Sequence, residues 1–142
     1  MSRYNLDNLF VQAEQVTASI AANVGNAGGF SVGIVNSNQN GRRISLSKAL
    51  CAKLQITDTA VFMPLPQEGV LLVANELPMP NAIKGNLKGE GKKLCYSAEL
   101  VLGLSKLFNL DFSTRTSMSF SDIEIDVKDD IPVAIVAIAN PA

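Results

Sequence analysis

The sequence predicts a mainly β protein with short helices, of the α+β class, built from two tandem pseudo-symmetric halves behind an N-terminal amphipathic helix. Three observations lead to this prediction. Apolar residues recur at helical spacing near the N-terminus, short alternating runs bounded by Asn, Gly and Pro fill most of the rest, and the order of these runs repeats. The 142 residues, 47% of them hydrophobic, are enough for one compact domain or two small ones that share a core.

Residues 5–24 are predicted to form the N-terminal helix, within a segment that we delimit as residues 1–28. Six apolar residues recur at three- and four-residue steps and form one stripe: Leu6, Leu9, Phe10, Ala13, Val16 and Ile20. Glycines at positions 25, 28 and 29 end the pattern. A helix with one apolar stripe must bury it, either on its own domain or on a second copy of the chain. The sequence leaves both possibilities open.

The first half is predicted to span residues 29–76. Strands are expected at 30–35 and 42–46, joined by a turn that ends in Asn40-Gly41, the strongest two-residue hairpin signal. Ser47 is placed to cap a short helix over 48–54. A hairpin of strands at 60–66 and 70–74 follows.

Residues 77–81 are the predicted linker, because prolines at positions 78 and 80 oppose both helix and central strand. The second half, 82–142, repeats the order. Strands are expected at 82–88 and 92–96, then a helix over 99–108 after Ser97, a long strand over 116–127, and a last strand over 131–138. The apolar phase of the long strand slips at Ser121-Asp122, which is typical of a bulge.

The two halves can be aligned by position. A shift of 50 matches Gly41-Arg42-Arg43-Ile44 with Gly91-Lys92-Lys93-Leu94 and the two capping serines with each other. A shift of 54 then matches Leu50 with Leu104, because the second helix is about one turn longer. Aligned positions of the two halves carry residues of the same chemical class more often than identical residues. This pattern indicates an internal duplication.

Composition excludes several function classes. The chain has no histidine, so Ser-His-Asp and Cys-His catalysis are excluded, and its two cysteines alone cannot complete a structural zinc site. We expect both cysteines to be free thiols and the protein to need no metal or cofactor. No apolar run reaches the roughly 20 residues that span a bilayer. The first seven residues do not form a secretory signal, so we expect a cytoplasmic protein.

Charge is distributed unevenly along the chain, although the net charge is −1. Residues 41–106 contain nine basic and five acidic residues, and residues 107–142 contain two basic and six acidic ones. A chain polarised in this way can present a basic face to phosphates, or the charges can form an ordinary solvated surface.

The run from Gly33 to Ala74 resembles the AbrB/MazE/SpoVT swapped-hairpin (looped-hinge) family. The resemblance rests on Gly-Arg at 41–42, the apolar strand and short helix that follow, and Leu54-Gln55-Ile56. Ser47 stands where the family usually has proline, and Gln55 where it usually has glycine. The resemblance implies a swapped-hairpin β-barrel, which two chains usually build together and which the two halves of this chain would build alone.

Family members are mostly DNA-binding transcriptional regulators or antitoxins, so the resemblance implies duplex DNA as partner. Arg42 and Arg43 fall where the family places its DNA-facing arginines, and their repeat counterparts are Lys92 and Lys93. Lys48, Lys84 and Lys88 would extend the contact surface. We expect the binding residues to be Arg42, Arg43, Lys48, Lys84, Lys88, Lys92 and Lys93.

The sequence offers two alternative functions. The first is a protein-interaction or oligomerisation module on the same fold, which binds no DNA and uses the acidic stretch 122–130 or self-association through residues 5–24. The second is an enzyme, for which Asp122, Glu124 and Asp126 could hold a divalent cation. Alternating acids are far more common on the solvent face of a strand, and Gly89-Glu90-Gly91-Lys92 lacks the spacing of a phosphate loop. We therefore expect no enzyme and no catalytic residue.

Overall fold

The computed structural model describes residues 29–37, 41–76 and 82–138. Within these residues the protein is mainly β, with two short helices and two antiparallel sheets, as the sequence predicts at the level of fold class. The N-terminal helix and the 77–81 linker lie outside the described residues. The element bounds are β1 Val32–Ser37, β2 Gly41–Leu46, α2 Lys48–Leu54, β3 Thr59–Leu65, β4 Val70–Ala74, β5 Ile83–Asn86, β6 Lys93–Tyr96, α3 Ala98–Leu107, β7 Ser117–Phe120, β8 Ile123–Lys128 and β9 Ile131–Ala137.

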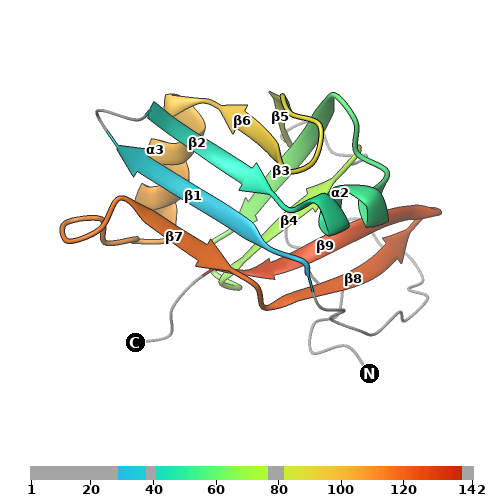
Figure 1. Cartoon of the computed structure of the whole chain (residues 1–142). Helices are drawn as coiled ribbons and strands as arrows, with labels where there is room; N and C mark the ends of the chain where they lie inside the picture. The colour runs from blue at the N-terminus through green and yellow to red at the C-terminus, as the bar shows by residue number, and fades with distance from the viewer. Residues whose placement is uncertain (1–28, 38–40, 77–81, 139–142) are drawn as a thin grey trace.

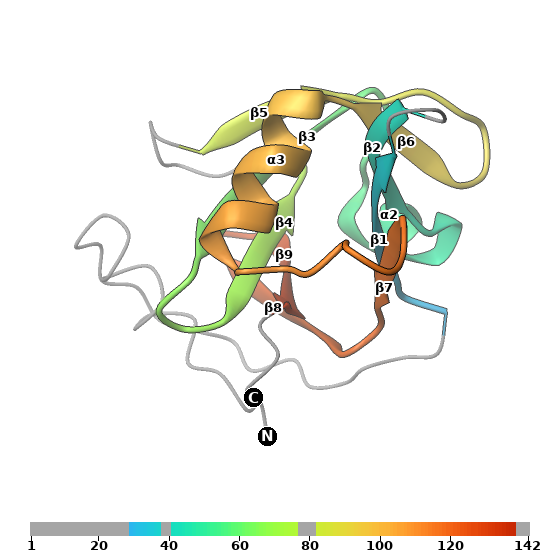
Figure 2. The same cartoon turned by 90° about the vertical axis from the view of Figure 1, so that its left-hand side faces the viewer.

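The strands form two layers rather than one closed barrel. One sheet has the order β6-β2-β1-β7 and the other the order β5-β3-β4-β9-β8 (Figures 1 and 2). An isolated bridge between Lys88 and Leu94 brings the chain after β5 to β6. The expected barrel is therefore not closed by hydrogen-bonded ladders among the described strands.

Each described strand of the first half pairs with a strand of the second half. β1 pairs with β7, β2 with β6, β3 with β5, and β4 with β9, all antiparallel. The described strands of the first half thus all have a partner in the second half. Neither half could bury its apolar faces without the other.

The main core lies between the sheets. Inward-facing residues of both sheets form it, and the helices add apolar side chains from two ends: Leu50, Cys51 and Leu54 from α2, and Leu100, Val101 and Leu104 from α3. The N-caps are the predicted serines, since Ser47 Oγ accepts from Leu50 N at 3.3 Å and Ser97 Oγ from Leu100 N at 3.1 Å. Both helices therefore begin where the sequence places them.

The predicted long strand over 116–127 is two strands. β7 pairs with β1 in one sheet and β8 pairs with β9 in the other. The phase slip at Ser121-Asp122 marks the point where the chain crosses between layers. A local bulge and a crossing between sheets disturb the alternation in the same way, so the pattern alone did not distinguish them.

The face of the five-stranded sheet turned away from the main core is also buried. A second apolar cluster lies there, formed by Met63, Leu65, Val70, Leu72, Ala74, Val133 and Ile135. Glu124, Asp126 and Lys128 of β8 are buried too. Alternating acids were expected on the solvent side of their strand, and for Glu124 and Asp126 this is wrong, since they are only 7% and 1% exposed.

Candidate nucleic-acid interface

The ladder between β2 and β6 is the centre of the candidate interface. Arg43 lies opposite Tyr96 and Leu46 lies opposite Lys93, so the two basic stretches are at opposite ends of four paired residues. At about 3.3 Å per residue, the two ends are roughly 10 Å apart along the strands. The antiparallel pairing of distant segments, and not their closeness in sequence, places basic residues at both ends of one ladder.

We call the side of the β6-β2-β1-β7 sheet that faces away from the core the ladder face. The register aligns two rows of side chains across it. The first row is Tyr96, Arg43, Val35 and Ser117, and the second is Leu94, Ser45, Gly33 and Ser119.

Three of the four residues in the second row, Ser45, Gly33 and Ser119, have small side chains or none, and Leu94 is the exception. A Cβ at Gly33 would lie 2.5 Å from Ser45 Oγ, so a larger residue there would require the Ser45 hydroxyl to rotate away. On the Gly33 side of Arg43, the neighbouring side chains of the ladder face are therefore short.

Arg43 and Tyr96 form the most prominent feature of the ladder face. The Arg43 guanidinium carbon lies 6.0 Å from the centroid of the Tyr96 ring, within the range of a cation–π contact. Tyr96 is 56% exposed, although large aromatic rings are usually buried. A guanidinium held beside an exposed ring is suited to phosphate and base contacts alike. Tyr96 was not among the predicted binding residues. It follows the apolar Cys95 on the same strand, and the alternation of side chains along a strand could have predicted that Tyr96 faces outward.

Arg42 points to the other side of β2, because neighbouring side chains of a strand alternate. Its Nε donates to Asn36 Oδ1 at 2.8 Å, across the β1–β2 hairpin. Arg42 and Arg43 thus have different surroundings although they are adjacent in sequence. Arg42 braces a turn, and Arg43 lies on the ladder face.

Lys93 resembles Arg42 in position and contact. Its Nζ donates to the Gly89 carbonyl at 2.7 Å, across the turn that precedes β6. Arg42 lies two residues before Ile44, and Lys93 lies two residues before Cys95, the residue opposite Ile44 in the ladder.

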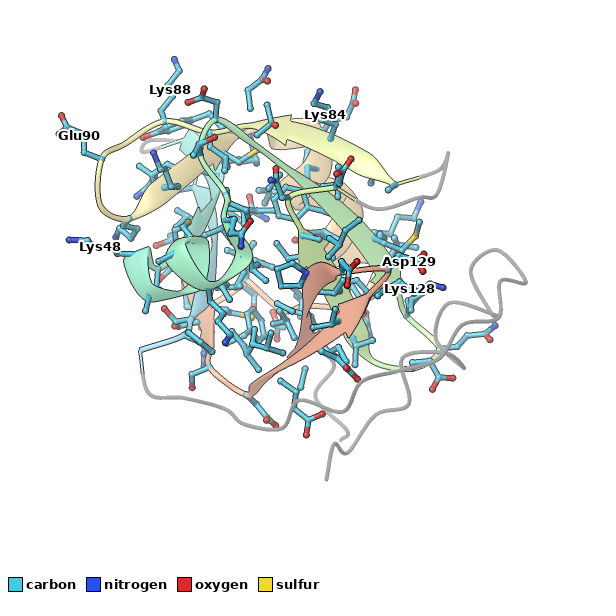
Figure 3. The ribbon with its side chains drawn as sticks, turned by 90° about the vertical axis from the view of Figure 1, so that its right-hand side faces the viewer. Lys48, Lys84, Lys88, Glu90, Lys128 and Asp129 are labelled. Carbon is cyan, nitrogen blue, oxygen red and sulfur yellow. The ribbon has the colours of Figure 1, made fainter. Side chains whose placement is uncertain are left out.

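The other predicted lysines are exposed. Lys48 begins α2, Lys84 lies on β5, and Lys88 and Lys92 flank the β5–β6 turn. Figure 3 shows Lys48, Lys84 and Lys88 on one side of the molecule, together with Glu90. The Cys51 thiol of α2 lies close enough to Lys93 to sense its charge, which places this turn next to α2. The structure therefore gathers lysines at the α2 end of the ladder and arginines at the other.

No family model, no curated protein and no solved structure matches this chain. The assignment of the ladder face therefore rests on geometry alone.

The described residues show no cluster of three or more metal-ligating side chains. Burial raises the pKa of the Cys51 and Cys95 thiols, which keeps both protonated near neutral pH. Cys51 Sγ donates to the Leu46 carbonyl at 3.9 Å. Neither thiol has the lowered pKa of a reactive cysteine. Among the described helices, none is long and apolar enough to cross a membrane.

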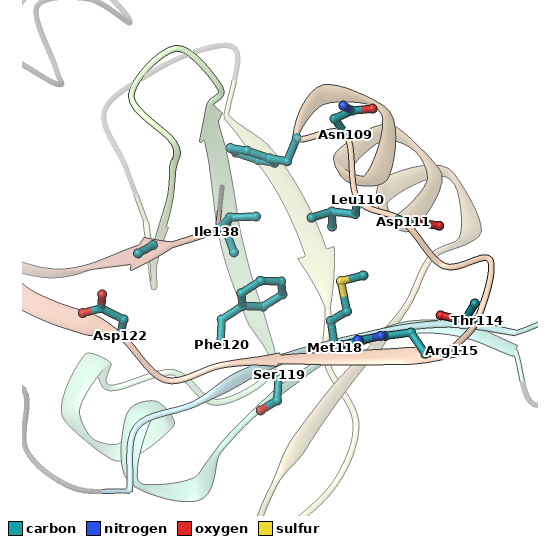
Figure 4. A pocket seen from close by; sticks show the side chains of 12 residues that line it. Asn109, Leu110, Asp111, Thr114, Arg115, Met118, Ser119, Phe120, Asp122 and Ile138 are labelled. Carbon is teal, nitrogen blue, oxygen red and sulfur yellow. The ribbon is translucent and has the colours of Figure 1, made fainter. Parts of the chain in front are cut away.

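A cavity of about 580 Å³ opens at the β7 edge, away from the lysines. Figure 4 shows Leu110, Met118 and Phe120 pointing into it. At its rim, hydrogen bonds from Ser113 are the main cause that lowers the pKa of Asp111, and nearby Arg115 adds to the effect. The cavity is lined by apolar and polar side chains alike, and it adds no side chain to the ladder face beyond Ser119.

Proposed function

We propose that this protein binds duplex DNA through the ladder face and acts as an AbrB-like transcriptional regulator or antitoxin-like protein of the cytoplasm. The observation that carries the proposal is the arginine beside an exposed tyrosine, Arg43 and Tyr96, at one end of the β2–β6 ladder, with exposed lysines at its other end. Basic surfaces of this kind suit a nucleic-acid backbone and groove edge.

The spacing of the basic groups supports a groove contact. The major groove of B-DNA is about 12 Å wide and admits a two-stranded β-ribbon. The ends of the β2–β6 ladder are separated by a comparable roughly 10 Å. Arg43 would then reach one border of the groove, and Lys92 with Lys48 the other border. Arginine can fork onto guanine or phosphate, whereas the lysines serve as point charges for phosphate.

The pairing between the two halves supports the AbrB-like part of the proposal. Swapped-hairpin proteins interlock two copies of one unit, and here β1 to β4 each pair with a strand from the second half. The two halves also make similar hydrogen bonds across a turn. Arg42 donates to Asn36 across the first turn, and Lys93 donates to the Gly89 carbonyl across the second. A single chain would in this way present both half-sites of one DNA-binding surface.

Adjacent arginines provide a matched test. Fluorescence anisotropy with a random-sequence duplex, titrated at low salt and again over a salt series, should show binding that weakens steeply as salt rises. Arg43→Ala should weaken binding by about 1–3 kcal/mol, and Arg42→Ala, which removes the same charge one position away, should change it far less. Lys92→Ala should reduce the salt slope by about one.

Two outcomes would contradict the proposal. Equal losses for Arg42→Ala and Arg43→Ala would mean that general charge and not the ladder face attracts DNA. No binding at low salt would exclude the DNA function and leave the interaction module. The exposed large apolar side chains of α3, Leu102 at 47% and Leu107 at 51%, favour a protein partner in that case.

A further inference from the structure

We propose that two copies of this protein associate through the exposed side of α3, with the two helices packed antiparallel about a twofold axis at the level of Leu102 and Gly103. We call this side, formed by Glu99, Leu102, Gly103 and Lys106, the outer face of α3. The proposal is independent of DNA binding, because the outer face and the ladder face share no residue.

The two sides of α3 have different surroundings. Leu100, Val101 and Leu104 are buried in the core between the sheets. The four residues of the outer face follow the i, i+3, i+4, i+7 spacing that places side chains on one side of a helix, and all four are exposed. Figure 2 shows α3 on the near side of the molecule. The helix therefore uses one side for the core of its own chain and presents the other to solvent.

The centre of the outer face is apolar and open to close approach. Leu102 is 47% exposed, and Leu107 at the border of the face is 51% exposed. Beyond the backbone of its own helix, nothing in the described part of the chain lies within 4 Å of a Cβ built on Gly103. A second helix can therefore come close at Gly103 and cover Leu102. A single exposed leucine needs no partner, but this one lies beside a position that leaves room for one.

The charges of the outer face show how a second copy would lie. Glu99 and Lys106 are seven positions apart, about 10.5 Å along the helix, which is beyond the three- and four-residue pairing within one helix. Glu99 and Lys106 have the same midpoint as Leu102 and Gly103. An antiparallel copy centred there places Lys106 of the partner subunit opposite Glu99, and Glu99 of the partner subunit opposite Lys106. The outer face is thus complementary to itself.

This symmetry favours a second copy over an unrelated helix as the occupant. An unrelated partner would need no common midpoint for the charged pair and the apolar pair, whereas a twofold interface does. A parallel arrangement would place Glu99 against its own equivalent, and like charges that face each other oppose association. The contact between two helices of ten residues is small, so the dimer should be weak and reversible.

Sedimentation equilibrium of the full chain, from about 10 µM to about 1 mM, tests the apolar centre. The native chain should show a reversible monomer–dimer equilibrium. Leu102→Asp should weaken it by at least about tenfold, because two carboxylates would meet near the axis. Ile83→Asp makes the same change at another exposed apolar residue, on β5 and 41% exposed, and should leave association unchanged.

Three results of this experiment would overturn the proposal. The first is a native chain that stays monomeric at about 1 mM. The second is an equal loss of association in Leu102→Asp and Ile83→Asp. The third is a dimer that Leu102→Asp leaves intact, which would assign self-association to another surface, such as the stripe of residues 5–24.

A charge swap tests the antiparallel arrangement. Glu99→Lys and Lys106→Glu each place like charges together at both ends of the contact, so each should weaken association by roughly tenfold at low salt. The double variant Glu99→Lys/Lys106→Glu restores both ion pairs and should restore association. Its charges oppose the dipole of α3 at both ends, so the recovery cannot come from a more stable helix. A double variant that associates no better than the single variants would show that these charges do not face each other.

Discussion

Arg42 and Lys93 occupy equivalent places on the two sides of the Ile44–Cys95 pair, and each braces the hairpin turn that precedes its own strand. The Arg42 donor reaches the side chain of Asn36, whereas the Lys93 donor reaches the backbone of Gly89. The fold therefore uses one basic residue from each basic stretch to fix a turn. Arg43, beside the Tyr96 ring, and the exposed Lys92 lie toward opposite ends of the same ladder.

Loss of the two braces should affect stability unequally. Arg42→Ala should lower the free energy of unfolding by about 0.5–1.5 kcal/mol, since the bond to Asn36 is partly shielded from water. Lys93→Ala should cost less, because its bond to Gly89 is exposed. Urea denaturation of both variants measures the difference. An Arg42→Ala variant as stable as the native chain would show that the brace contributes nothing.

Gly85 should be intolerant of any side chain. An added Cβ would lie 2.7 Å from Cys95 Sγ and 3.2 Å from the Phe62 ring, both inside the main core. Gly85→Ala should therefore destabilise the protein by about 1–3 kcal/mol through overpacking.

Gly103 is the matched control for Gly85. It lies in α3 with open space around its Cβ position, so Gly103→Ala should stabilise the protein by about 0.5–1 kcal/mol. Thermal unfolding of the two alanine variants should shift Tm in opposite directions. Shifts of the same sign would contradict the packing described for β5.

Gln55 is strained at the end of α2. Its φ is 58°, in the left-handed region that glycine adopts without steric cost. Gln55→Gly should raise the free energy of unfolding by up to about 1 kcal/mol, despite the greater entropy of glycine in the unfolded chain. Gln67→Gly, in the β3–β4 turn where the residue has no positive φ, should give no such gain. Urea denaturation of both variants tests this.

Stability should fall in alkaline solution because of the buried thiols. Burial raises the pKa of Cys95 above its ordinary 9.0, so the folded chain keeps a proton that the unfolded chain releases at high pH. The contribution of Cys95 is fully present below about pH 9 and is lost as pH rises through the folded pKa. Urea denaturation at pH 8 and pH 10 should show a smaller loss for Cys95→Ala than for the native chain. An equal loss would exclude Cys95 as a cause.

Local sequence patterns predicted most elements because they depend on near neighbours. Ser47 and Ser97 cap the helices, and the bounds of α2 and β4 agree with the periodicity. Alternation within β2 also contained the information that Arg42 and Arg43 face opposite sides, although the resemblance to a family grouped them as one site.

The sequence by itself determined the mainly β class, the order of the elements and the positions of their caps, since turn residues and apolar periods act within a few positions. Only the tertiary structure decided that the strand near 121–122 crosses between sheets and that Lys93, like Arg42, makes a hydrogen bond across a turn. It also decided that Glu124 and Asp126 are buried. Pairing between distant strands is set by the shared core that they enclose, and no local pattern records it.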